Sequence, residues 1–330
     1  MNNFVIIGLG SMGKRRIRCL IDLGVDASNI YGYDIRKDRC AEASEKYGIN
    51  ILSNPESINF ETVKGVIVSL PPDKHAYGVG IAQKYHKPVF IEASVVLEDV
   101  IAIKEGNPDD VFLAPSCTFR FHPMIKAVRD IVKSEKYGKV TNFSYHSGQY
   151  LPDWHPWEGV NEFYVGNRVT GGGREIVPYE LTWMVDVFGY PEEIKGYFRK
   201  TLNIGCEIED SYACCLGYKD KVGTLIVDVA SRYAVRNLIV NFERGQIQWR
   251  WDKKQIEVYD AVSQKWDYIS QGVQKREDGY NPNIGEDMYI EEIKAYLEGI
   301  QDPSKYPTTI DYDIDVLKLL KGIEDSDGGF

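Results

Sequence analysis

The sequence has few of the residues that mark metal-binding or disulfide-bonded proteins. Its 330 residues include five histidines without metal-ligand spacing and six cysteines without a CxxC or Cys/His pattern. We therefore predict no bound metal and cysteines that are mostly reduced and buried. Adjacent Cys214 and Cys215 should point to opposite faces of a strand.

Long apolar runs and excess positive charge are also missing. No window reaches the roughly 18 apolar residues of a spanning helix, and the first residues lack a basic segment and cleavage site. Lys and Arg number 39 against 49 Asp and Glu, so a nucleic-acid partner, which depends on clustered positive charge, is excluded. We expect a cytoplasmic protein that binds no nucleic acid and no membrane.

The first 120 residues alternate short apolar runs with helical patterns, as βαβ units do. Helices are expected at 11–24 and 36–48, each closed by a glycine. This rhythm predicts an α/β, doubly wound parallel sheet domain over residues 1–120. Its strands are expected at 4–8, 29–34, 50–53, 65–70, 88–93 and 111–116.

The pattern changes after residue 120, where long alternating strands follow a helix. We predict an α+β domain over 121–330 with a large, mostly antiparallel sheet, helices on one face, and the other face free for a partner subunit. A homodimer or homotetramer through this sheet is expected, with Trp249 and Trp251 at the interface. The C-terminal helix could pack against the first domain instead of the second. Strands are expected at 139–151, 193–202, 211–218, 221–230, 237–243 and 245–252, and helices at 123–138, 286–300 and 312–326.

A glycine motif, "VIIGLGSMG", follows the first apolar strand and opens the first helix. A dinucleotide needs one glycine for the turn, one for the approach of the pyrophosphate, one for helix packing, and an acid after the next strand for the ribose. Asp34 supplies that acid, which favours NAD. The expected cofactor-binding residues here are Gly8, Gly10, Ser11, Met12, Gly13 and Asp34.

Two further groups bear on the cofactor. Arg36 and Lys37 are either a solvated helix start or a sign that NADP is tolerated. Ligands of such folds lie outside the carboxyl ends of the strands, so Ser69, Pro71, His75 and Glu92 should fall near the nicotinamide. His75 could equally cap or pack its helix.

These motifs together resemble the Gfo/Idh/MocA oxidoreductase family. The resemblance rests on the glycine loop, "LPPDKHA", "KPVFIEA", "FRFHPMIKAV", "YGKVTNFSY", the three glycines at 171–173 and "LKLLKGIEDSDGG", and it covers nearly the whole chain. It implies a hydride exchanged between a nicotinamide and a sugar-like alcohol.

Two positions depart from the family pattern. The family's Glu-Lys-Pro is replaced by Glu92, Ala93 and Ser94, and alanine cannot donate a proton. Tyr179 stands where the family places a histidine, so the resemblance makes it the candidate acid/base, and Glu175 could replace the family acid. Alternatively, Tyr179 only packs its ring and Glu175 lies in solvent.

Four residues are candidates for substrate contact. Trp154 and His155 lie in a polar, proline-broken loop, where aromatic faces suit a sugar ring or only hold the loop together. Arg168 could lower the pKa of the tyrosine phenol. Arg120 could bind an anionic group or form an interdomain ion pair.

We therefore predict an NAD(P)-dependent oxidoreductase acting on a sugar, amino sugar or sugar nucleotide. Two alternatives stay open: a nucleotide-binding sensor or partner subunit without hydride chemistry, and a non-redox enzyme that uses NAD transiently.

Overall fold

The computed structural model describes residues 2–154, 159–275 and 285–329, and the chain forms two compact units. The first comprises Met1–Thr118 and Asp287–Asp315, and the second comprises Phe119–Glu286 and Val316–Phe330. The segment Asp287–Asp315 thus belongs to the first unit, whereas the sequence-based division assigned it to the second domain and allowed only the last helix to pack against the first.

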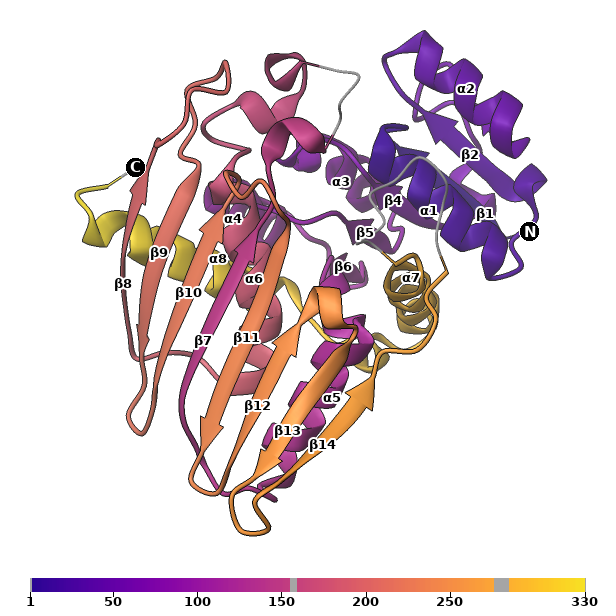
Figure 1. Ribbon diagram of the computed structural model, residues 1–330. Coiled ribbons are helices and arrows are strands. Elements are labelled where there is room, and N and C mark those ends of the chain that lie inside the picture. Colours follow the sequence, from indigo (N-terminus) through magenta and orange to yellow (C-terminus); the bar gives the residue numbers. More distant parts are fainter. Residues whose placement is uncertain (1, 155–158, 276–284, 330) are drawn as a thin grey trace. The chain divides into compact units, whose positions relative to one another are not determined.

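The first unit is built on a six-stranded parallel sheet in the order β3-β2-β1-β4-β5-β6 (Figure 1). Its central strands are mostly apolar, and all five residues of β1 are buried, as expected for parallel strands covered on both faces. The elements are β1 (Asn3–Ile7), α1 (Ser11–Asp22), β2 (Ile30–Tyr33), α2 (Lys37–Tyr47), β3 (Asn50–Ile51), β4 (Val63–Val68), α3 (His75–Lys84), β5 (Val89–Ile91), α4 (Leu97–Glu105), β6 (Leu113–Pro115) and α7 (Asp287–Gly299).

Helix α7 is held to this sheet by a buried tyrosine. The Tyr296 hydroxyl donates to the carbonyls of Val66 and Pro88, at 3.0 and 2.9 Å. A Cβ atom at Gly65 would lie 2.4 Å from that hydroxyl, so β4 needs a glycine where the ring approaches. This contact explains why the segment from residue 287 folds with the first unit.

The second unit contains an eight-stranded sheet in the order β14-β13-β12-β11-β7-β10-β9-β8, antiparallel except for the β7–β10 pair. The predicted mostly antiparallel sheet is confirmed, and it includes two strands that were not predicted from the sequence, β13 and the nearly fully exposed β14. The elements are α5 (Pro123–Ser134), β7 (Val140–Gly148), α6 (Gly173–Phe188), β8 (Glu193–Arg199), β9 (Ser211–Gly217), β10 (Val222–Asp228), β11 (Val235–Phe242), β12 (Gly245–Arg250), β13 (Gln255–Asp260), β14 (Lys265–Ser270) and α8 (Ile310–Ser326), which begins in the first unit.

Helices α5 and α6 cover one face of this sheet (Figure 1). Phe143 of β7 stacks on Phe188 of α6 with ring centroids 3.9 Å apart. Gly223 makes room for that ring, since a Cβ there would lie 2.1 Å from Phe143. The core of the unit therefore lies between the sheet and these helices.

Trp249 belongs to this core. Its side chain is 1% exposed, and its ring centroid lies 5.5 Å from that of His122. The prediction that Trp249 lies at a subunit interface is wrong, because its side of β12 points into the covered face. Trp251 follows in a short 3-10 turn, where its Nε1 donates to the Ala234 carbonyl.

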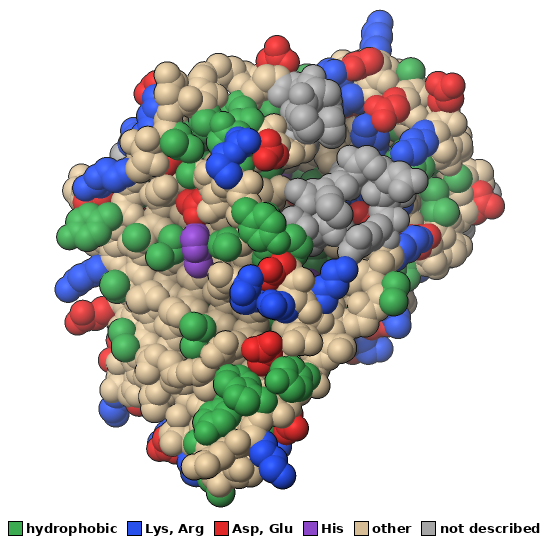
Figure 2. Space-filling view, in the orientation of Figure 1, with side chains coloured by type: hydrophobic (Ala, Val, Ile, Leu, Met, Phe, Trp, Pro, Cys, Tyr) green, Lys and Arg blue, Asp and Glu red, His purple; other side chains and the backbone are tan. Residues whose placement is uncertain are grey.

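The other face of the sheet is open, and few charged side chains lie over its middle strands (Figure 2). Strand register aligns its outward residues in rows across β9, β10, β7, β11 and β12. Two of these rows contain no acid and no base: Cys215, Thr224, Ser144, Ile239 and Gln248, and Gly217, Val222, Asn142, Asn241 and Gln246.

Candidate functional site

The glycine loop between β1 and α1 has the close contacts that its motif predicts. Gly8 has φ +96°, and a Cβ there would lie 2.4 Å from the Ser69 carbonyl oxygen. A Cβ at Gly13 would lie 1.9 Å from the Gly8 carbonyl oxygen. Gly10 is less crowded, because the nearest atom to such a Cβ is an Arg39 nitrogen at 3.5 Å, an ordinary contact distance.

The start of α1 is suited to an anion. Gly10 has no side chain to cap the helix, and Ser11, Met12, Gly13 and Lys14 bring no acid to the first turn. The N–H groups and the helix dipole therefore favour a phosphate there.

Asp34 follows β2 and binds the loop itself. Its Oδ2 accepts from the Leu9 N–H at 2.8 Å and its Oδ1 from the Arg36 N–H at 2.8 Å. Each carboxylate oxygen has a second lone pair for a ribose hydroxyl.

Arg39 is the basic residue that faces Asp34, with 3.8 Å between its Nη1 and Oδ2 of the aspartate. Arg36, which was interpreted from the sequence either as part of a solvated helix start or as a sign of NADP tolerance, is exposed and pairs with Asp38. Arg39 was missed from sequence; it lies in the first turn of α2, three residues after Arg36, which precedes that helix.

Glu92, at the end of β5, is fixed by a buried arginine. Arg16 of α1 donates to both of its carboxylate oxygens, at 2.6 and 2.9 Å, and to Glu292 of α7 at 2.8 Å. Ser69 also donates to Glu92, at 3.3 Å. Arg16 and Glu292 were missed from sequence because they lie 276 residues apart.

His75 takes part in packing rather than facing solvent. It is 1% exposed, its Nε2 lies 3.0 Å from the Leu70 carbonyl, and its Nδ1 lies 3.3 Å from the Ser94 hydroxyl. Burial lowers its pKa to about 4, so the ring is neutral near pH 7. Pro71 precedes the turn that leads into His75.

In the second unit, the three glycines form a tight turn before α6. A Cβ at Gly171 would lie 2.0 Å from the Val165 carbonyl oxygen. Gly172 has φ +67°, and the Gly173 N–H donates to the Glu209 carbonyl at 3.0 Å. The turn therefore fixes where α6 begins.

The first turns of α6 carry the two predicted catalytic residues. Glu175 is not in solvent: its Oε1 accepts from the Tyr164 hydroxyl at 2.7 Å, while its buried Oε2 has no hydrogen-bond partner among the described residues. Burial raises the pKa of Glu175 to about 7, against the lowering effect of the Tyr164 hydrogen bond. Tyr179 lies one helical turn further on and packs against Phe119, with ring centroids 5.6 Å apart.

The loop that holds Tyr164 also holds Trp154. Both residues pack against a small buried cluster that includes Leu151, Val165 and Val229. The buried Trp154 Nε1 has no acceptor among the described residues. His155, the other aromatic candidate, lies outside the described residues.

The two predicted arginines are both ion-paired within the second unit. Arg168 binds Glu209 at 2.7 Å, and Arg120 binds Asp186 of α6 at 2.8 Å. Arg120 therefore forms an ion pair, as one of its two interpretations held, but its partner lies in the same unit.

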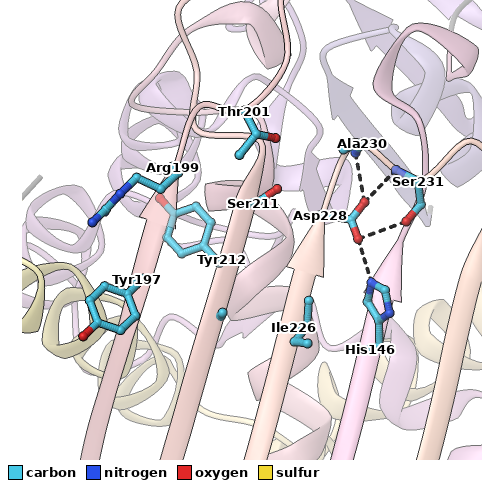
Figure 3. A pocket seen from close by; sticks show the side chains of 11 residues that line it. His146, Tyr197, Arg199, Thr201, Ser211, Tyr212, Ile226, Asp228, Ala230 and Ser231 are labelled. Carbon is cyan, nitrogen blue, oxygen red and sulfur yellow. Dashed lines mark hydrogen bonds and ion pairs between the residues drawn. The ribbon is translucent and has the colours of Figure 1, made fainter.

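A pocket of about 450 Å³ opens on the uncovered face of the sheet (Figure 3). The His146 ring and the Asp228 carboxylate meet there at 2.6 Å, and Ser231 donates to Asp228 at 3.0 Å. None of the predicted site residues lines it. The pocket therefore belongs to the open face of the sheet and is distinct from the predicted site at the start of α6.

The described residues contain no group of three His, Cys, Asp or Glu side chains that could hold a metal ion. In the same ranges, no helix combines the length and the apolar character that crossing a membrane requires.

The first unit thus has the form of a dinucleotide-binding domain: an open parallel sheet, a glycine loop, and an acid after the second strand. Residues 2–104 match the family model described as an oxidoreductase family with an NAD-binding Rossmann fold. Residues 125–248 match the GFO/IDH/MocA C-terminal domain. The two matches cover more than half of the chain, which therefore belongs to the Gfo/Idh/MocA family of NAD(P)-dependent oxidoreductases.

Solved structures share this fold over nearly the whole chain. An oxidoreductase from Agrobacterium radiobacter in complex with NAD+, L-tartaric acid and magnesium has a TM-score of 0.84 at 14% identity, over 98% of this chain and 95% of that one. Levoglucosan dehydrogenase in complex with NADH and levoglucosan has a TM-score of 0.81 at 14% identity, over 99% and 97%. GenD2 from gentamicin A biosynthesis, in complex with NAD, has a TM-score of 0.78 at 15% identity, over 98% and 93%. Comparison with curated proteins yields no match.

Proposed function

We propose that this protein transfers a hydride between NAD and a hydroxyl-bearing carbon of a sugar, amino sugar or sugar nucleotide. The observation that carries the proposal is the start of α6, where a glycine turn is followed by Glu175 and, one helical turn later, by Tyr179. Levoglucosan dehydrogenase, bound to NADH and levoglucosan, supports the substrate class at the level of the fold.

The cofactor would be held by residues whose contacts suit it. The loop from Gly8 to Gly13 and the start of α1 would take the pyrophosphate, and Asp34 would take the adenosine ribose. The nicotinamide supplies the hydride acceptor or donor when bound. The nicotinamide would bind near Ser69, Pro71, His75 and Glu92.

The preference for NAD would come from Asp34, whose carboxylate repels a 2′-phosphate. Use of NADP would depend on Arg39, the cation that faces Asp34, more than on the exposed Arg36.

Proton exchange is assigned to Tyr179. Its phenol would give a proton to a carbonyl oxygen or take one from a hydroxyl. Glu175 lies on the same side of the helix, and its raised pKa lets it hold or release a proton near pH 7. The remaining candidates for substrate contact are Trp154, Arg168 and Arg120. Each arginine would contact the substrate while keeping its ion pair.

The test is a Tyr179→Phe variant, measured with sugars and nucleotide sugars by the absorbance of the reduced cofactor. We expect loss of about 100-fold or more in kcat with unchanged NAD affinity. Tyr268→Phe, on an exposed strand, serves as the control. Full activity of Tyr179→Phe would remove the tyrosine from the mechanism.

One observation favours a protein without hydride chemistry. After Glu92 the chain has Ala93, which cannot donate a proton, and the neighbouring Ser94 hydroxyl lies against buried His75. A sensor, a partner subunit or a non-redox enzyme using NAD transiently would show tight NAD binding with no net change in cofactor redox state for any substrate.

The open sheet face is proposed as the site of self-association. Its two uncharged rows would be unusual on a solvated surface of a protein with 27% charged residues. Charge depletion is typical of interface cores. Side-chain amides such as Asn142, Asn241 and Gln246 both donate and accept, so they can pair with their own copies across a two-fold axis.

Light scattering after gel filtration tests this proposal. An Ile239→Arg variant places a charge in the middle of the face and should yield monomer from a homodimer, or a lower oligomer from a homotetramer. Val262→Arg, on the exposed β13–β14 turn, is the control. An unchanged mass for Ile239→Arg, or a monomeric parent protein, would refute it.

A further inference from the structure

The acids of helix α6 differ in how they are neutralised. Glu180 is fully buried, accepts from the Trp183 indole at 2.7 Å and lies 3.4 Å from the Arg236 guanidinium. Asp186 binds Arg120 at 2.8 Å and Arg129 at 3.2 Å.

Glu175 is the exception on this helix. Its hydrogen bond from Tyr164 brings no charge, and its Oε2 has no partner within the part of the chain that is described. A buried acceptor without a donor destabilises the fold, so such groups usually bind a ligand or water.

The arginines beside the glycine turn are already neutralised. Arg174 binds Glu324 at 2.7 Å, and Arg168 binds Glu209 at 2.7 Å. The buried Oε2 of Glu209 also lacks a hydrogen-bond partner among the described residues. A ligand at this turn would therefore meet unsatisfied carboxylate oxygens rather than free cations.

We propose that the site at the start of α6 selects uncharged sugars and amino sugars, and rejects sugar acids, sugar phosphates and nucleotide sugars. The inference rests on the proposed function and narrows its substrate class. Hydroxyl and ammonium groups donate hydrogen bonds, which Glu175 can accept. A carboxylate or phosphate would be repelled above about pH 7, where Glu175 is ionised. The orphaned Trp154 indole N–H provides one donor for a hydroxyl oxygen.

The test compares matched ligands on the NADH-loaded protein. Calorimetry is done at pH 8 with glucose, galactose and mannose, their 2-amino forms, their uronic acids and 6-phosphates, and the UDP-sugars. We expect every anionic member to bind about tenfold or more weakly than its uncharged parent. An anionic member that binds as tightly as its parent would overturn the inference and leave the proposed function standing. Failure of every member to bind would overturn both.

Two variants test whether the carboxylates of Glu175 and Glu209 cause the selection against anionic ligands. Glu175→Gln should bring the anionic and uncharged members closer in affinity, because it removes the charge and keeps the shape. Glu209→Gln should strengthen anion binding, because it frees the Arg168 guanidinium.

The control is Arg232→Ala. This exposed arginine lies 3.8 Å above the Tyr150 ring and should not affect the selection. Unchanged selection in both glutamine variants, or loss of selection in Arg232→Ala, would show that the carboxylates do not face the substrate.

Discussion

Replacing Glu175 by glutamine should stabilise the folded protein above neutral pH while weakening catalysis. Burial raises the pKa of this carboxyl from 4.5 to about 7. Between these values the folded protein holds a proton that the unfolded chain has released. The stabilisation is therefore complete below about pH 4.5 and is lost as the pH rises through 7.

The size of the effect follows from the same two values. A pKa difference of one unit corresponds to about 1.4 kcal/mol, so the free energy of unfolding falls by up to about 3 kcal/mol across this range. Glutamine keeps an acceptor for the Tyr164 hydroxyl and has no charge to bury. At pH 8 the variant should be about 1–3 kcal/mol more stable than the parent, and near pH 4, where the carboxyl is protonated in both the folded and the unfolded chain, the two should agree within about 0.5 kcal/mol.

Urea denaturation of the cofactor-free protein at several pH values measures this difference. Other groups also titrate: His75 and His122 are buried and neutral, with pKa values lowered to about 4 and about 3, so they destabilise the fold as the pH falls below 6.5. Their contributions cancel when the variant is subtracted from the parent.

The control is Glu207→Gln, a side chain that is 87% exposed, which should change stability by less than about 0.5 kcal/mol at any pH. If the Glu175→Gln and parent curves run parallel from pH 5 to pH 8, the carboxyl is not protonated in the folded state. The argument for its proton-holding role then fails.

Three further predictions concern the first unit. Asp34→Ala should weaken NAD binding about tenfold or more in a fluorescence titration, because it removes both a ribose ligand and a loop contact. The control, Asp38→Ala, should have little effect. Equal losses of affinity in the two variants would contradict the assignment of Asp34. Gly13→Ala should abolish NAD binding, because its Cβ would overlap the Gly8 carbonyl. The control, Gly80→Ala, lies in open space on α3 and should raise the free energy of unfolding by about 0.5–1 kcal/mol. Normal NAD affinity in the Gly13 variant would rule out this loop geometry. Arg16→Met should lower the free energy of unfolding, measured by urea denaturation, by about 3–5 kcal/mol, because it leaves the buried carboxylates of Glu92 and Glu292 uncompensated. A loss below about 1 kcal/mol would show that these carboxylates are protonated or hydrated.

Local sequence signals were sufficient for the first sheet and the cofactor loop. The glycine spacing, the acid after the second strand and the alternation of strands and helices each depend on neighbours within about 30 residues. Gly8, Gly13 and Asp34 accordingly make the contacts that their motif requires. Strand β14 was missed because its side chains are nearly all exposed and carry no apolar pattern, whereas β13 was missed although Ile256 and Val258 alternate as buried residues.

The sequence by itself thus determined the fold class, the family and the position of the glycine loop, because these follow from periodicity and short spacings. Only the tertiary structure decided the state of each charged group. Glu92 is fixed by Arg16, Asp186 neutralises Arg120, and Glu175 keeps an oxygen without a partner. Burial and long-range pairing set the pKa and the availability of a side chain, and neither is contained in the residues adjacent to it.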